Sequence, residues 1–125
     1  MNLIFKARLV LAAAAMLVAL TACQQKPDVQ AKKYATVAEA SKALDAESEI
    51  IDRLIVQLGQ AKDPAEEKKL SCEQIPAHYA QMLAIMEANQ HLMSDADQNV
   101  QQQFKQLAEQ QKIRFQSNLL CKSAH

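Results

Sequence analysis

The chain has 125 residues, which is the size of one ordinary domain. Its 14 basic and 14 acidic residues give a formal net charge of zero, so no excess of positive charge favours nucleic-acid binding. With one glycine, three prolines and no tryptophan, the composition favours helices and offers little for a sharply turned phosphate-binding or nucleophile loop.

The first 22 residues have the organisation of a secretory signal peptide. The basic residues Lys6 and Arg8 are followed by an unbroken apolar run over residues 9–20 and then by small residues. This run is too short for a mature transmembrane helix, which needs about 20 residues. We therefore expect residues 1–22 to be removed, which would leave 12 basic and 14 acidic residues and a net charge of −2.

The motif at the cleavage site is Leu20-Thr21-Ala22-Cys23, which resembles the lipobox of bacterial lipoproteins. The resemblance covers the signal peptide and this cysteine. It implies transfer of diacylglycerol to the Cys23 thiol, cleavage after Ala22 and acylation of the new amino terminus. In enteric members of the family an Asp after the cysteine retains the protein in the inner membrane, so Gln24 implies the outer membrane, on its periplasmic or its surface-exposed face.

The polar segment 23–35 is interpreted as the lipidated cysteine and a flexible tether. It contains Pro27 and almost no apolar periodicity, and fully extended it would reach about 40 Å from the lipid. The folded domain is then expected to occupy residues 36–125.

The first predicted helix begins with a capping box formed by Thr36 and Glu39. Gly59 weakens its end, and Asp63 followed by Pro64 stops it. Its apolar residues recur at spacings of three, four and seven and predict one buried line, consisting of Val37, Ala40, Leu44, Ile51, Ile55 and Leu58.

Asp63 and Pro64 are also start signals, and they predict a short second helix that runs to about Cys72. Pro76 either breaks this helix or opens a third one that continues to about Met93. The apolar side of the third helix is predicted to consist of Tyr79, Met82, Leu83, Met86 and Met93.

Ser94 and Asp95 cap the last predicted helix. Its buried side is predicted to consist of Val100, Phe104, Leu107, Phe115 and Leu119, with Gln111 on the same line. Strand patterns are nearly absent. We therefore predict an all-α fold, a small bundle of three long helices and one short helix.

Cys72 and Cys121 are the two thiols that remain if Cys23 is acylated, and export would bring them into an oxidising compartment. Cys72 precedes the third helix and Cys121 ends the last one, so an antiparallel hairpin of these helices brings the two cysteines to the same end. This layout predicts a Cys72–Cys121 disulfide. The alternative is a pair of buried free thiols.

The three histidines do not form a convincing metal site. His78 and His91 point about 220° apart on one helix, His125 is the last residue, and structural zinc sites normally use four ligands. The sequence also has no Gly-rich phosphate loop and no metalloprotease motif. We expect no metal, no cofactor and no enzymatic activity.

Two features could serve recognition. Met82, Met86 and Met93 lie on one side of the third helix, either as an adaptable binding face or, as we favour, as core. The Gln-rich stretch 98–111 is either a binding surface or, as we favour, a solvated face.

We expect a non-enzymatic outer-membrane lipoprotein that binds a protein or an envelope component. The alternatives are a small-ligand or metal-binding domain and an inhibitor or immunity-type lipoprotein.

Overall fold

The structure is a computed structural model that describes residues 31–122, and within them it contains helices and no strand. The signal peptide, Cys23, Gln24 and His125 lie outside the described residues. No helix among those described is long and apolar enough to span a membrane. The elements are α1 (Val37–Gln60), α2 (Pro64–Lys69), η1 (Leu70–Gln74), α3 (Ile75–Ala88), η2 (Gln90–Leu92), α4 (Asp95–Gln116) and α5 (Leu119–Lys122).

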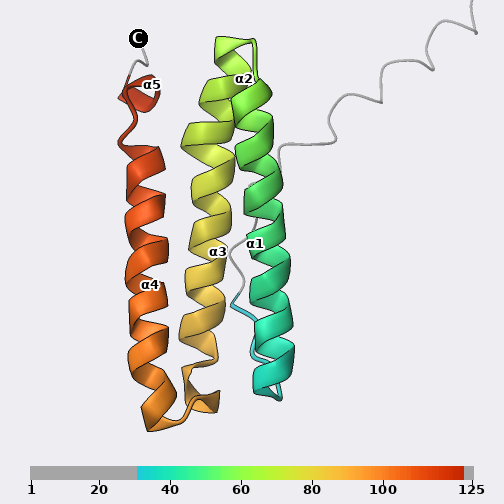
Figure 1. Ribbon diagram of the computed structural model, residues 1–125, viewed down its shortest axis with the longest axis vertical. Helices are drawn as coiled ribbons and strands as arrows, with labels where there is room; N and C mark the ends of the chain where they lie inside the picture. Colours follow the sequence, from blue (N-terminus) through green and yellow to red (C-terminus); the bar gives the residue numbers. More distant parts are fainter. Residues whose placement is uncertain (1–30, 123–125) are drawn as a thin grey trace, which may run out of the picture.

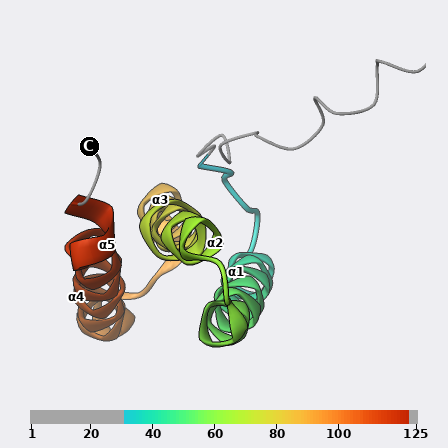
Figure 2. The ribbon, with the colours of Figure 1, turned by 90° about the horizontal axis from the view of Figure 1, so that it is seen from above.

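Three long helices run antiparallel to their neighbours in the order α1, α3, α4 (Figure 1). The middle helix α3 packs against both outer helices, whereas α1 and α4 make little contact with each other. In the view from above, α1 and α4 lie on the same side of α3, so the three axes form an open V (Figure 2). The predicted all-α bundle of three long helices is confirmed, and its core is open on one side.

Side-chain caps start the helices where the sequence predicts them. The Thr36 hydroxyl accepts a hydrogen bond from the Glu39 amide at 3.2 Å, and the Glu39 carboxylate accepts one from the Thr36 amide at 3.3 Å. The Asp63 carboxylate accepts from the Ala65 amide at the start of α2, and the Ser94 hydroxyl accepts from an amide in the first turn of α4. Each cap satisfies a backbone N–H that the helix leaves unpaired.

A π-helical segment joins α2 to α3. Pro76 is the second residue of α3, so it opens this helix, as one of the two sequence alternatives predicts. The chain nevertheless stays helical through η1, where the Ile75 amide donates to the Leu70 carbonyl five residues back. Proline lacks an N–H and crowds the carbonyl four residues before it, and the wider π turn removes the demand for that hydrogen bond.

The helix α3 ends at Ala88, five residues before the predicted end at Met93. Asn89 leaves the helical conformation, with φ −113° and ψ 12°, and is followed by the single turn η2. Its side chain is used for a contact with the N-terminal segment, which is described below. The end of α3 thus coincides with a residue that has both a local contact, to Ile85, and tertiary contacts.

The prediction for the buried side of α4 is wrong for most of its residues. Val100, Phe104 and Leu107 are more than half exposed and Leu119 is 80% exposed, whereas Phe115 and Gln111 are half-buried. The helix instead packs through the line that includes Gln101, Lys105, Ala108, Lys112 and Phe115, roughly a quarter of a turn away. The small Ala108 lies in this line, and its size lets α4 approach α3 closely.

The prediction for α1 is largely right, with two exceptions. Ala40 and Ile51 are buried and Leu44 and Leu58 are half-buried, but Val37 is 43% and Ile55 is 40% exposed. Both exceptions lie on the side of the buried line that α3 does not cover. The buried apolar residues of the described chain are Ala40, Ile51, Leu70, Ile75, Ile85, Met86 and Ala108.

The predicted Cys72–Cys121 disulfide is present. The two Cα atoms are 5.5 Å apart, and the bridge joins η1 to α5 at one end of the antiparallel α3–α4 hairpin. At the same end, the Asn118 amide donates to the hydroxyl of the fully buried Ser71 at 3.4 Å. The hairpin layout and the pairing of the cysteines are both confirmed.

Candidate partner-binding surface

The largest apolar side chains left uncovered in the middle of α4 lie on one line. Val100 and Leu107 are each 52% exposed and Phe104 is 59% exposed. Their spacings of four and three residues place them on one side of the helix. We call this surface the α4 face. Single exposed apolar residues are normal, but a contiguous line with an aromatic residue at its centre is typical of an interaction site.

The surroundings of the α4 face carry almost no charge. Between Gln98 and Gln111 the only charged residues are Lys105 and Glu109. Lys105 forms an ion pair with Glu87 of α3, and Glu109 forms one with Lys112 at 2.8 Å. Lys105 and Glu109 lie on the side of α4 that is turned away from the α4 face. A partner of the α4 face would therefore meet apolar side chains flanked by glutamine amides.

Tyr79 of the middle helix α3 interacts with residues of both outer helices, α1 and α4. Its ring stacks on Phe115 of α4, with the ring centroids 6.2 Å apart. Its hydroxyl has a raised pKa, because burial disfavours the phenolate and because the nearby Asp52 of α1 repels it. Tyr79 therefore contacts α4 through Phe115, and the charge of Asp52 on α1 acts on its hydroxyl.

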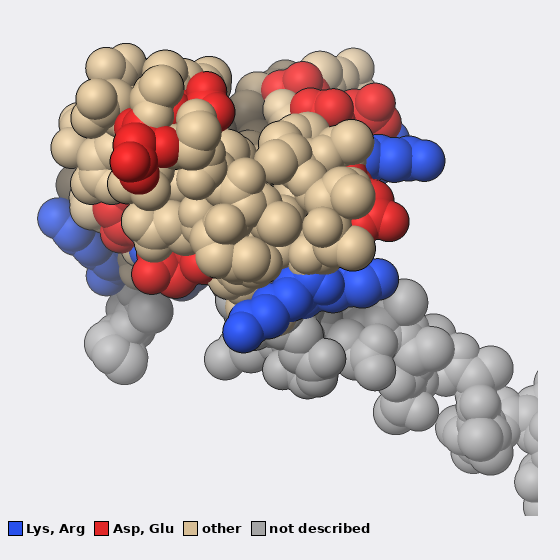
Figure 3. All heavy atoms as spheres, turned by 90° about the horizontal axis from the view of Figure 1, so that it is seen from below, with Lys and Arg blue, Asp and Glu red and all other residues tan. Residues whose placement is uncertain are grey.

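The end-on view from below shows two lobes separated by an indentation at the upper edge. The middle of this end is uncharged, while charged side chains lie on the left lobe and along the outer edges (Figure 3). These lobes correspond to the two outer helices of the V. Ile55 adds an apolar side chain on α1, 40% exposed, to the side on which the α4 face lies.

The methionine line of α3 is mostly part of the packing. Met86 is buried, and Met82 and Met93 are half-buried. Met86 also presents its backbone carbonyl to α4, where it accepts a hydrogen bond from the Gln101 amide at 3.3 Å. The structure thus leaves the more exposed apolar line on α4, not on α3.

The two described histidines lie apart. The His78 ring contacts the Glu47 carboxylate at 2.7 Å across the α1–α3 interface, whereas His91 is exposed in η2. Among residues 31–122, no group of three or more His, Cys, Asp or Glu side chains could hold a metal ion.

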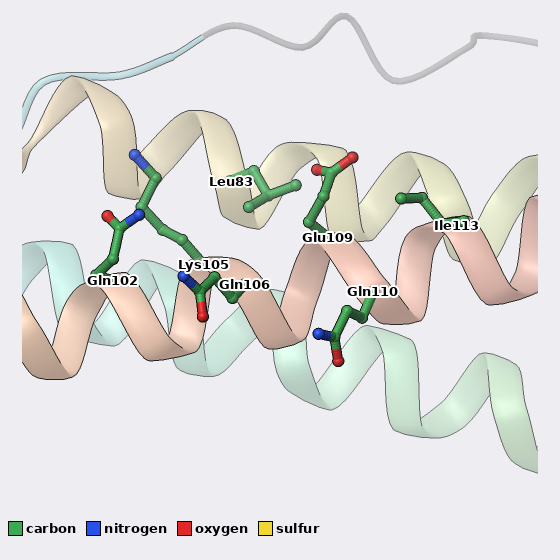
Figure 4. Close-up of a pocket in the computed structure, with 7 residues that line it drawn as sticks. All are labelled: Leu83, Gln102, Lys105, Gln106, Glu109, Gln110 and Ile113. Atoms are coloured by element: carbon green, nitrogen blue, oxygen red, sulfur yellow. The ribbon is translucent and has the colours of Figure 1, made fainter.

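A shallow depression of about 390 Å³ lies between α3 and α4. Leu83 comes from α3 and the other lining residues come from α4, and their side chains stand along an open surface (Figure 4). The lining residues are Leu83, Gln102, Lys105, Gln106, Glu109, Gln110 and Ile113. Small-ligand sites enclose most of their ligand, so this open, glutamine-rich surface lacks the usual form of such a site.

Asn89 fastens the N-terminal segment to the end of α3. Its side chain is 2% exposed; the Oδ1 atom accepts a hydrogen bond from the Tyr34 amide at 2.7 Å, and the Nδ2 atom donates to the carbonyls of Lys32 at 2.9 Å and Ile85 at 2.8 Å. Within the described residues, the N-terminal segment is therefore held against the domain from Lys32 onward.

Asn89→Ala is expected to lower the free energy of unfolding by about 1–3 kcal/mol, because the hydrogen bonds of a buried amide are lost. The Tyr34 amide should also exchange its hydrogen with solvent faster. Denaturant unfolding and hydrogen exchange measure the two effects. Asn99→Ala on the exposed surface of α4 is the control, and equal effects from both variants would contradict the fastening role of Asn89.

Comparison with protein-family models, with curated proteins and with solved structures finds no match for this chain. The candidate surface therefore rests on the residues themselves. Sequence periodicity already placed Val100, Phe104 and Leu107 on one line, but it assigned that line to the core. For Asn89 the sequence offers one signal, an asparagine near the end of a helical stretch.

Proposed function

We propose that this protein is an outer-membrane lipoprotein, held by lipid on Cys23, whose helical domain acts without catalysis by binding another protein of the cell envelope. The observation that carries the binding role is the exposed α4 face, with Phe104 at 59% exposure between Val100 and Leu107. Aromatic side chains are enriched in the cores of protein–protein interfaces, where a few buried residues supply most of the binding energy.

The motif at residues 20–23 and the preceding signal-peptide pattern support the anchor. Gln24 supports the outer membrane, through the sorting rule that the resemblance implies. The hydrogen bonds of Asn89 support a domain held within about 30 Å of the lipid, since the chain is fastened from Lys32 onward. A protein held at this distance would meet envelope components by diffusion in two dimensions.

The alternative of a small-ligand domain has the shallow depression between α3 and α4 as its best location. Ile113 lines this depression and is 52% exposed, the same fraction as Leu107 of the α4 face. The two residues belong to the same helix and point in different directions. They therefore offer a matched pair for separating the two candidate surfaces.

The test is a cross-linked pull-down of the full-length protein from its own envelope, with wild type, Phe104→Glu and Ile113→Glu compared. We expect Phe104→Glu to lose the cross-linked partner, because a carboxylate in an apolar interface must be desolvated. Ile113→Glu should retain it. Loss of the partner only in Ile113→Glu would move the binding site to the depression, and retention in both variants would contradict a role for the α4 face.

A further inference from the structure

We propose that the open V of α1, α3 and α4 is a groove for one amphipathic helix of a partner protein, with the apolar side of that helix in the groove and basic residues along the flank that faces α1. The inference deepens the proposed function and rests on it, because the α4 face forms one wall of the groove. Apolar grooves of this kind are a common way in which proteins recognise amphipathic helices.

Helix geometry turns apolar residues of both outer helices toward the same opening. Seen from above, α1 and α4 run toward the viewer, so each turns counterclockwise by about 100° per residue (Figure 2). Ile51 is buried on the side of α1 that packs on α3, and Ile55, four residues later, is turned counterclockwise toward α4. Ala108 is buried on α4, and Phe104, four residues earlier, is turned clockwise toward α1.

The space between these walls is hollow and its floor is apolar. In the space-filling view, the indentation separates the lobes that belong to the two outer helices (Figure 3). Tyr79 of α3 lies at the floor, because its ring stacks on Phe115 of α4 and the charge of Asp52 of α1 acts on its hydroxyl. Met82, three residues further along α3, is half-buried beside it. A partner in this groove therefore meets apolar groups on three sides.

The rim of the groove on α1 is acidic. Asp52 directly follows the buried Ile51, and Asp45 precedes it by six residues, so both carboxylates are turned about 100–120° from the α3 side toward the opening. Both residues are exposed, and neither forms an ion pair with another of residues 31–122. Figure 3 shows acidic side chains beside the indentation on the right lobe, which belongs to α1. Lys42 and Arg53 lie on the opposite side of α1 from α3.

The two walls differ in charge, and this difference defines the partner. The middle of the α4 wall carries apolar side chains and glutamines, and its basic residue Arg114 lies ten residues beyond Phe104, toward the disulfide end. Asp45 and Phe104 lie at similar heights, because α1 and α4 begin at the same end and the two residues are eight and nine positions along them (Figure 1). Asp45 and Asp52 are about 10 Å apart along the axis, so basic residues two turns apart on one flank of the partner match them.

The groove offers a partner side chains rather than a sheet edge, since the described residues contain no strand. A backbone that enters an apolar groove must satisfy its own N–H and C=O groups, which a helix does within itself. One such helix beside α1, α3 and α4 also completes a four-helix arrangement.

The first experiment measures the binding of designed peptides to the full-length protein in mild detergent. The basic peptide is a helix of about 18 residues with leucines on one side and two lysines, two turns apart, on one flank. The acidic peptide has glutamates in place of these lysines, and a third peptide has the basic composition in scrambled order. Fluorescence anisotropy of the labelled peptide is read against detergent alone. We expect the basic peptide to bind about tenfold more tightly than the acidic one, and the scrambled one not to bind. Equal affinity of the basic peptide and either other peptide would overturn the proposal.

The second experiment exchanges the charges of the rim. Asp45→Asn with Asp52→Asn should abolish the preference for the basic peptide, and Asp45→Lys with Asp52→Lys should reverse it. Ala46→Lys with Gln57→Lys is the matched control: it changes the net charge as much as the asparagine pair does, but on the exposed side of α1 turned away from the groove, and should keep the preference. Helical circular dichroism verifies the fold of each variant. An unchanged preference in the lysine pair at positions 45 and 52 would contradict the acidic rim.

This inference and the proposed function fail in distinguishable ways. If the pull-down loses its envelope partner in Phe104→Glu but keeps it in Asp45→Lys with Asp52→Lys, the α4 face binds that partner without a basic helix, and only this inference is wrong. A captured partner that is a second copy of this chain has the same consequence. If the basic peptide binds as expected while Phe104→Glu keeps the envelope partner, the groove accepts basic helices and the proposed role of the α4 face in the envelope is wrong.

Discussion

Replacing both bridged cysteines, Cys72→Ser with Cys121→Ser, is expected to lower the free energy of unfolding by about 4 kcal/mol. The bridge closes a loop over a sequence separation of 49 residues, and without it the unfolded chain regains the entropy of that loop. The bridge also ties α5, which otherwise contacts mainly η1, to the rest of the domain. For a domain of this size the change corresponds to a fall in melting temperature of roughly 15 °C or more.

Thermal unfolding followed by circular dichroism measures this effect. At low temperature the helical signal should stay largely unchanged, because the α3–α4 interface and the caps remain. A reducing agent serves as the control: it should lower the melting temperature of the wild type and leave that of the double variant unchanged. Equal melting temperatures of wild type and double variant without reductant would show that packing alone holds the hairpin.

Cys23→Ala is expected to abolish lipid attachment completely. Metabolic labelling with a palmitate analogue should mark the wild type and not the variant, which should appear as an unprocessed precursor or as a soluble exported protein. The reason is chemical, because an alanine offers no thiol for the diacylglycerol. In density-gradient fractionation the wild type should migrate with outer-membrane markers.

The double variant Cys72→Ser with Cys121→Ser is the matched control for labelling. It loses two thiols and should still be labelled, since its lipid attachment site is intact. Label that persists in Cys23→Ala would contradict the anchor. Label together with inner-membrane migration of the wild type would contradict only the sorting role of Gln24.

Local chemistry in the sequence was enough to predict where most helices begin. Thr36 and Glu39 form the predicted capping box, Asp63 caps α2, and Ser94 caps α4. These signals work because each cap involves atoms only two or three residues apart, so no distant contact is needed. The disulfide was predictable for a related reason: two helices joined by a short turn place Cys72 and Cys121 at one end.

The helical fold class, the caps, the bridge and the shared line of Val100, Phe104 and Leu107 on α4 all follow from the amino-acid sequence. The exposure of this line follows from the packing of the three long helices. Periodicity shows which residues share a face, but which face packs depends on what the neighbouring helix offers. Here α4 meets α3 through Ala108, which allows a close approach. The V formed by the three helices is open on that side of α3, so the apolar line of α4 stays uncovered. The periodicity of a single helix cannot predict this, because the exposure depends on the positions of all three helices.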